Sequence, residues 1–154
     1  MKAKIFFSLV LLTVIFSCGR QEDPTPDEEG ARYHIGEYEE SGVFGNITFR
    51  KIDETSTSVS LQMEGTPVGG VHPVRIYDTE PGSGGPAIST LSPVDGGTGL
   101  SETRVSELDD GTPANYEYWV DFNGFVVVYN SEEAMEPIAI GIIGDVDPDI
   151  PDGY

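Results

Sequence analysis

Residues of the types that carry out chemistry are few in this chain of 154 residues. The single cysteine, Cys18, offers one thiol for acylation, and one thiol cannot form a disulfide within the chain. The two histidines, His34 and His72, are too few to build a multi-imidazole site for copper or zinc by themselves. The chain has no G-x-S-x-G motif and no P-loop lysine, and its many carboxylates single out no catalytic pair. These observations predict a protein that is not an enzyme.

The segment that precedes Cys18 has the organisation of a secretory signal peptide. Two lysines come first, an apolar run follows over residues 5–16, and a small residue stands directly before the cysteine. The run is shorter than the roughly 20 residues that a membrane-spanning helix needs. Residues 15–18, Ile-Phe-Ser-Cys, resemble the lipobox of bacterial lipoproteins, which implies cleavage before Cys18 and acylation there, with palmitate among the acyl groups. The alternative is an ordinary signal peptide with a chance cysteine near its end.

The chain is strongly acidic, with 27 Asp and Glu against 8 Lys and Arg and a formal charge of −19 at pH 7. Such a surface repels phosphates and anionic headgroups, which disfavours nucleic acids and lipid surfaces as partners of the domain itself. Cations, cationic proteins and neutral glycans are compatible with this charge. A second explanation is that the charge simply keeps an exported domain soluble.

Changes in composition along the chain predict four segments. Residues 1–17 form the lipoprotein signal peptide, and residues 18–32 an acidic flexible tether that has too few apolar residues to fold. Residues 33–146 form one domain, and residues 147–154 an acidic tail. The aspartates near the end of the chain lack the spacing of an EF-hand calcium loop, so we expect a solvated tail.

Alternating apolar and polar residues predict an all-β domain. In residues 58–64, Val59, Leu61 and Met63 alternate with polar residues, which is typical of a half-buried strand. The other segments with strand-like patterns are 47–50, 116–121, 125–129 and 138–143. Turn clusters rich in Gly, Pro and Asp separate the strands, and a short helical turn is expected at residues 130–133. This organisation favours an antiparallel Greek-key β-sandwich of the superoxide-dismutase or immunoglobulin-like type.

The chain also resembles CHRD domains, modules named after chordin. Residues 70–77, Gly-Val-His-Pro-Val-Arg-Ile-Tyr, are similar to a CHRD strand of the form G-x-H-P-x-H-I-H. Residues 85–96, 124–131 and 138–144 are similar to later parts of the same domain, and the likeness extends over residues 42–144. Because CHRD domains in turn resemble Cu/Zn superoxide dismutases, the resemblance implies a dismutase-like sandwich.

The resemblance implies a metal site as well, but this chain has other residues at the ligand positions. Alternate residues of a strand point to one face, so histidines at such positions can converge on a copper or zinc ion. Here those positions hold Arg75, Tyr77 and Tyr129, and a permanently charged arginine cannot be a ligand. His72 is then either a residual ligand or a histidine bonded to backbone near a turn. We therefore expect no metal and no cofactor.

We call His72, Arg75, Tyr77 and Tyr129 the tyrosine patch. Exposed tyrosine and arginine are frequent hot-spot residues, which makes this patch the candidate ligand-binding site predicted from the sequence. The alternative is a packed surface cluster in which the arginine stem lies on an aromatic face.

Together these features predict a non-catalytic lipoprotein of the cell envelope that carries a CHRD-like binding or interaction domain. The expected location is the outer membrane, with the domain either periplasmic or exposed at the surface. The lipid anchor provides the contact with the membrane, and a protein or a glycan is the expected partner. A copper- or zinc-binding protein, or a superoxide dismutase-like one, is the alternative.

Overall fold

The computed structural model describes residues 30–80 and 82–144. The predicted signal peptide, Cys18 and the predicted tail at 147–154 lie outside these residues, as does nearly all of the predicted tether. The first strand begins at Ala31, within the last residues of the segment predicted as tether. No helix among the described residues is both long and apolar enough to span a membrane.

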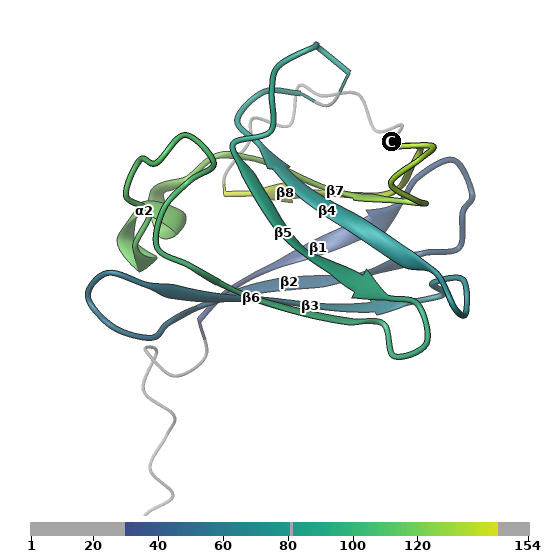
Figure 1. The fold of residues 1–154 in the computed structure, drawn as a ribbon, viewed down its shortest axis with the longest axis horizontal. Coiled ribbons are helices and arrows are strands. Elements are labelled where there is room, and N and C mark those ends of the chain that lie inside the picture. Colours follow the sequence, from purple (N-terminus) through teal and green to yellow (C-terminus); the bar gives the residue numbers. More distant parts are fainter. Residues whose placement is uncertain (1–29, 81, 145–154) are drawn as a thin grey trace, which may run out of the picture.

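The described residues form eight antiparallel strands and one short helix (Figure 1). In chain order these elements are β1 (Ala31–Glu37), β2 (Phe44–Lys51), β3 (Thr57–Glu64), β4 (Val71–Tyr77), β5 (Ser89–Asp95), β6 (Leu100–Val105), α2 (Tyr116–Asp121), β7 (Gly124–Tyr129) and β8 (Pro137–Ile143). The order of hydrogen-bonded neighbours is β1-β2-β3-β6-β5-β4-β7-β8, and β8 pairs again with β1. The sheet is therefore closed on itself.

The expected all-β class is confirmed, but the expected open Greek-key sandwich is wrong: the fold is a closed barrel. A sandwich keeps two sheets with free edges, whereas here β1 pairs with β8 from Ile35 opposite Gly141 to Glu37 opposite Ala139. Gly141 allows this pairing, because a Cβ at that position would lie 2.6 Å from the carbonyl oxygen of His34. On the other side, β5 and β6 join through Asp95 opposite Leu100. Both seams connect strands into one continuous ring.

The interior of the barrel is filled by the apolar side of each alternating strand. Val59, Leu61 and Met63 of β3 all point inward and are buried, which confirms the strand predicted over residues 58–64. The strands predicted at 47–50, 125–129 and 138–143 are confirmed as parts of β2, β7 and β8. Because inward and outward residues alternate in any strand, these patterns are the same in a barrel and in a sandwich.

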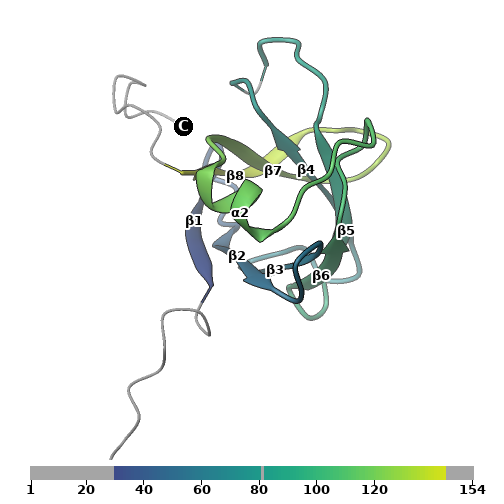
Figure 2. The ribbon, with the colours of Figure 1, turned by 90° about the vertical axis from the view of Figure 1, so that its left-hand side faces the viewer.

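Helix α2 covers one end of the barrel, as Figure 2 shows. Its Trp119 is fully buried and stacks on Phe49 of β2, with ring centroids 5.1 Å apart and an angle of 26° between the planes. Asn115 caps the helix, since its side-chain oxygen accepts a hydrogen bond from the amide of Tyr118 at 3.1 Å. The strand predicted at residues 116–121 is thus wrong, because the asparagine cap and the burial of Trp119 outweigh the alternating pattern.

A turn occurs after β7, close to the helical turn predicted at residues 130–133. Ser131 acts as its cap, with the hydroxyl accepting a hydrogen bond from the amide of Ala134 at 3.2 Å. The amide of Met135 donates to the carbonyl of Ser131 at 3.0 Å, which closes the turn before β8. The turn is therefore shifted by one residue from its predicted start.

Candidate functional site

Three members of the tyrosine patch lie together on the outer face of β4 and β7. Arg75 and Tyr77 occupy alternate positions of β4, and Tyr129 is the last residue of β7. The hydroxyls of Tyr77 and Tyr129 are 2.8 Å apart and share a hydrogen bond. Tyr129 is only 8 % exposed, and this burial, together with the bond to Tyr77, raises the pKa of its phenol. The two tyrosines therefore form a packed, neutral pair.

Arg75 is already engaged with the turn that follows β7. Its Nη2 lies 3.3 Å from Oε1 of Glu132. Its Nε is buried and has no hydrogen-bond partner among the described residues. The charge of the guanidinium is thus balanced by Glu132, and its buried Nε faces away from solvent, so the tyrosine patch resembles a packed surface cluster more than an open binding site.

His72, the fourth member of the tyrosine patch, is buried and does not contribute to the surface of the patch. The imidazole is 1 % exposed, and Nδ1 lies 2.9 Å from the carbonyl oxygen of Asn130 and 3.3 Å from that of Tyr129. On the other side of the ring, Nε2 lies 3.4 Å from the carbonyl oxygen of Pro67. His72 therefore joins the β3–β4 loop to the end of β7, which is the second of the two roles considered for it from the sequence.

The residues at the positions implied by the CHRD resemblance do not fit a copper or zinc ion. Both nitrogens of His72 face backbone carbonyls, and Arg75 faces Glu132. Across residues 30–80 and 82–144, no group of three or more His, Cys, Asp and Glu side chains is placed to hold a metal ion.

A second site lies on the opposite side of the barrel, where the outer faces of β1, β2, β3 and β6 form a hollow of about 410 Å³. We call it the polar hollow. Its lining is Arg32, Asn46, Thr48, Arg50, Ser60, Leu61, Gln62, Leu100, Ser101 and Glu102. The hollow is open to solvent and lined mainly by polar side chains, unlike the enclosed apolar pockets that bind most small molecules.

Strand register explains why these polar residues meet. Thr48 of β2 lies opposite Arg32 of β1 and opposite Ser60 of β3, and Ser60 in turn lies opposite Glu102 of β6. One step along the strands, Asn46, Gln62 and Leu100 form a second row across β2, β3 and β6. Since the alternate residues of these strands fill the core, the residues of these two rows face outward.

Most of these polar side chains have no partner within the protein. Among the described residues, no side-chain hydrogen bond or ion pair involves any of six of them: Arg32, Asn46, Thr48, Arg50, Ser60 and Gln62. Ser101 donates to the carbonyl of Ser92, and Glu102 accepts from the hydroxyl of Ser58 at 3.0 Å. The hollow therefore presents donors and acceptors that are available to a ligand.

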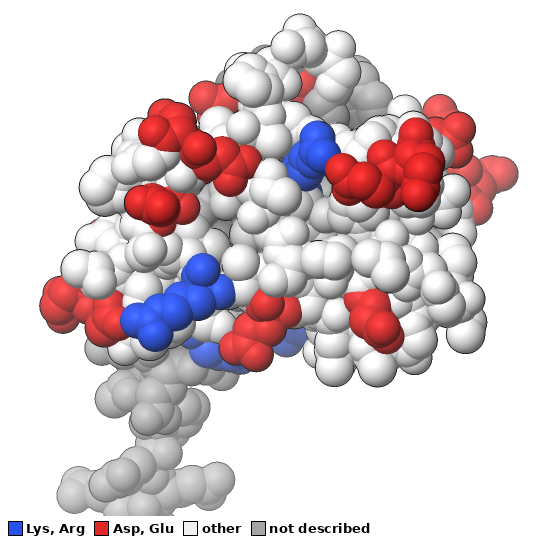
Figure 3. Space-filling model, viewed as in Figure 1, with Lys and Arg blue, Asp and Glu red and all other residues white. Residues whose placement is uncertain are grey.

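The other basic side chains of the described residues are all paired. Lys51 lies 2.9 Å from Glu117, Arg104 lies 2.7 Å from Asp53, and Arg75 contacts Glu132 as above. Figure 3 shows acidic side chains spread over the visible face, with basic ones mostly toward the lower side, where β3 and β6 run in Figure 1. Of the arginines in the described part of the chain, Arg32 and Arg50 have no acidic partner among the described residues, and both line the polar hollow.

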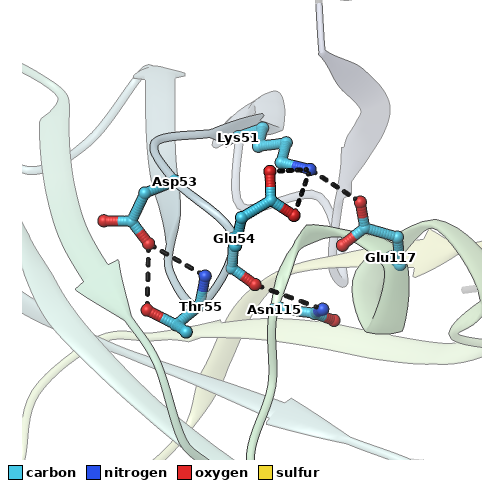
Figure 4. Close-up of polar contacts among 6 residues, drawn as sticks. All are labelled: Lys51, Asp53, Glu54, Thr55, Asn115 and Glu117. Atoms are coloured by element: carbon cyan, nitrogen blue, oxygen red, sulfur yellow. Dashed lines mark hydrogen bonds and ion pairs between the residues drawn. The ribbon is translucent and has the colours of Figure 1, made fainter.

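The loop beside the polar hollow is held in place by a network of polar contacts, shown in Figure 4. Lys51 bridges Glu54 of the β2–β3 loop and Glu117 of α2, and hydrogen bonds to both carboxylates raise the pKa of the lysine. The amide and hydroxyl of Thr55 donate to Asp53, and such bonds lower the pKa of that carboxyl to about 2. The end of β2 that carries Arg50 is thus anchored to the rest of the barrel.

The sequence alone does not predict the polar hollow, although part of the pattern that forms it is visible there. The positions that alternate with the core residues of β2 and β3 carry Asn46, Thr48, Arg50, Ser60 and Gln62. Their polarity is visible in the sequence, but the strand pairs that align them are not. No family model matches the chain, and no curated protein matches it. The CHRD resemblance therefore stays a prediction.

Proposed function

We propose that this protein is a non-catalytic binding module held at the cell envelope by lipid on Cys18. The observation that carries the binding role is the polar hollow, with its hydrogen-bonding side chains that have no partner within the described barrel. A rigid sheet face with free donors and acceptors suits recognition, because little ordering is required when a ligand binds. The sequence before Cys18 supports the anchor, and a glycan is the partner whose hydroxyls such side chains suit best.

The polar hollow also offers little of what hydrolytic or transfer chemistry needs. Its lining contains no histidine and no cysteine, and Glu102 is its single carboxylate. General acid–base catalysis and glycoside hydrolysis usually use a second titratable group at a defined distance. This composition supports binding rather than turnover.

Metabolic labelling with an alkyne fatty acid tests the anchor. The intact chain is expected to take up label and to partition into the membrane fraction, whereas Cys18→Ser is expected to lose both properties. Ser17→Ala keeps a small residue before the cysteine and serves as the matched control that should still be labelled. Equal labelling of the intact chain and Cys18→Ser would contradict the anchor.

An array of envelope glycans probed with the soluble Cys18→Ser protein tests the binding role. We expect retention on a subset of glycans and loss of that retention in Asn46→Ala/Gln62→Ala, which removes two free amides from the polar hollow. Arg75→Gln, on the opposite side of the barrel, is the control that should bind as before. Retention that depends on Arg75 and not on the amides would assign binding to the tyrosine patch instead.

A further inference from the structure

We propose that the polar hollow binds a carboxylate-bearing sugar residue of an acidic glycan, with the carboxylate held between Arg32 and Arg50. This inference rests on the proposed binding function and names its ligand class. It also differs from what the net charge of −19 suggests, because that charge favours cationic or neutral partners. The charges of the side chains around the polar hollow therefore determine the ligand class, rather than the net charge of the whole chain.

The two arginines are placed to act on one anion. Arg32 lies opposite Thr48, and Arg50 is two residues further along the same strand and on the same face. Such diagonal neighbours have Cα atoms about 7–8 Å apart, a distance that two long side chains easily bridge. Thr48, the neighbour of both in the sheet, is largely buried and lines the polar hollow.

A guanidinium group matches a carboxylate better than it matches most other ligands. Its planar N–H groups can form two parallel hydrogen bonds to the two carboxylate oxygens. Neither Arg32 nor Arg50 forms an ion pair with a described residue, so a ligand does not have to displace an internal acid. Because Glu102 also lines the hollow, one singly charged carboxylate group between the arginines suits it better than a doubly charged phosphate group.

The rest of the polar hollow suits the hydroxyls and the ring of a sugar. Asn46 and Gln62 lie opposite each other on β2 and β3, and their free amides can each donate to one hydroxyl and accept from another. Leu100 continues this row with an apolar surface that is 53 % exposed. Beyond Asn46 on the same face of β2, Phe44 is 43 % exposed and offers an aromatic surface to the C–H face of a sugar.

A titration of the Cys18→Ser chain with two matched trisaccharides tests this inference. Trigalacturonate carries a carboxylate on each ring, and α-1,4-galactotriose carries a neutral hydroxymethyl group at the same position. By calorimetry or NMR, we expect the unmodified hollow to bind the acidic trisaccharide at least tenfold more tightly than the neutral one. Arg32→Gln and Arg50→Gln should each weaken acidic binding about tenfold or more, because each removes a charged hydrogen-bond donor.

Arg75→Gln is the matched control, since it makes the same substitution on the opposite face and should leave both affinities unchanged. Thermal unfolding shows whether each variant is folded. Equal affinity for the two trisaccharides, or an Arg32→Gln/Arg50→Gln variant that binds like the parent, would overturn the proposal. Binding of only the neutral trisaccharide, with a dependence on Asn46, would also overturn this proposal but would leave the proposed binding function intact.

Two further arms distinguish other carboxylate sources. An acidic hexaglutamate peptide that binds through both arginines more tightly than trigalacturonate would assign the polar hollow to an acidic protein segment and overturn the glycan proposal. Residues 22–29 of this chain are themselves rich in Asp and Glu and shortly precede Arg32. If trigalacturonate binds only after their carboxylates are changed to amides, the hollow belongs to this chain's own segment, which also overturns the proposal.

Discussion

Closure of the barrel can be tested at Gly141, where β8 meets β1. A Cβ added there would lie 2.6 Å from the carbonyl oxygen of His34, 3.0 Å from Cγ1 of Ile35 and 3.1 Å from Cα of Ile35. Two of these atoms are backbone, so the strands themselves must move to admit a methyl group. Overpacking of this kind costs about 1–3 kcal/mol, so Gly141→Ala is expected to lower the free energy of unfolding by that amount.

Gly36→Ala is a control within the same seam. Gly36 lies opposite Ile140, and a Cβ there would approach nothing nearer than the carbonyl oxygen of Ile140 at 3.8 Å, an ordinary contact. With no clash, the substitution mainly reduces the freedom of the unfolded chain, which stabilises a protein by about 0.4–1 kcal/mol. The two glycine substitutions are therefore expected to have opposite signs.

Urea unfolding followed by tryptophan fluorescence measures both effects. Trp119 is the single tryptophan of the chain and is fully buried, so its emission reports the loss of the core. With a denaturant slope of about 2 kcal/mol per molar urea, a loss of about 2 kcal/mol shifts the midpoint by about 1 M. Gly141→Ala at least as stable as the parent, or equal midpoints for the two variants, would refute the β1–β8 pairing.

Two further predictions concern the tyrosine patch. His72→Leu should lower the free energy of unfolding by about 1–3 kcal/mol in the same urea assay, because the carbonyls of Asn130 and Tyr129 lose a buried donor. His72→Gln should restore part of the loss, and unchanged midpoints would contradict this role of His72. The raised pKa of Tyr129 keeps its phenol protonated in the folded state at pH values where the same phenol ionises in the unfolded chain. The free energy of unfolding should therefore fall as pH rises above about 10, by at most about 1.4 kcal/mol per pH unit. Tyr129→Phe should remove that part of the decline in alkaline urea titrations, and an identical pH profile in the variant would count against it.

Much of the local structure was predictable, because alternation in a strand follows from covalent geometry alone. The spacing of Val59, Leu61 and Met63 indicates one buried face of a strand, and the structure buries all three. The same pattern wrongly predicts a strand at residues 116–121, since Tyr116, Tyr118 and Val120 alternate there with their neighbours as in a strand. The segment forms a helix instead, because Asn115 caps it and Trp119 is buried at the end of the barrel.

The candidate site was harder to predict, because it depends on which strands are neighbours. Arg75 and Tyr77 share one strand face, so their juxtaposition was predictable, whereas the burial of His72 among carbonyls was one of two alternatives. The polar hollow joins Arg32 of the first strand to Glu102 of the sixth, and no local pattern links residues so far apart. The negative net charge of the chain predicts cationic or neutral partners and gives no indication that strand register brings two arginines together.

The sequence by itself determined an acidic all-β domain, because composition and periodicity are local properties of the chain; the lipoprotein leader that it indicates stays a prediction. Tertiary structure alone decided between an open sandwich and a closed barrel, since that choice depends on whether β1 reaches β8. It also decided which basic side chains form an ion pair within residues 30–80 and 82–144, as Arg75 does with Glu132, and which form none there, as is the case for Arg32 and Arg50. The physical reason is that hydrogen bonds and ion pairs are formed between neighbours in space, and pairing across distant strands creates those neighbours.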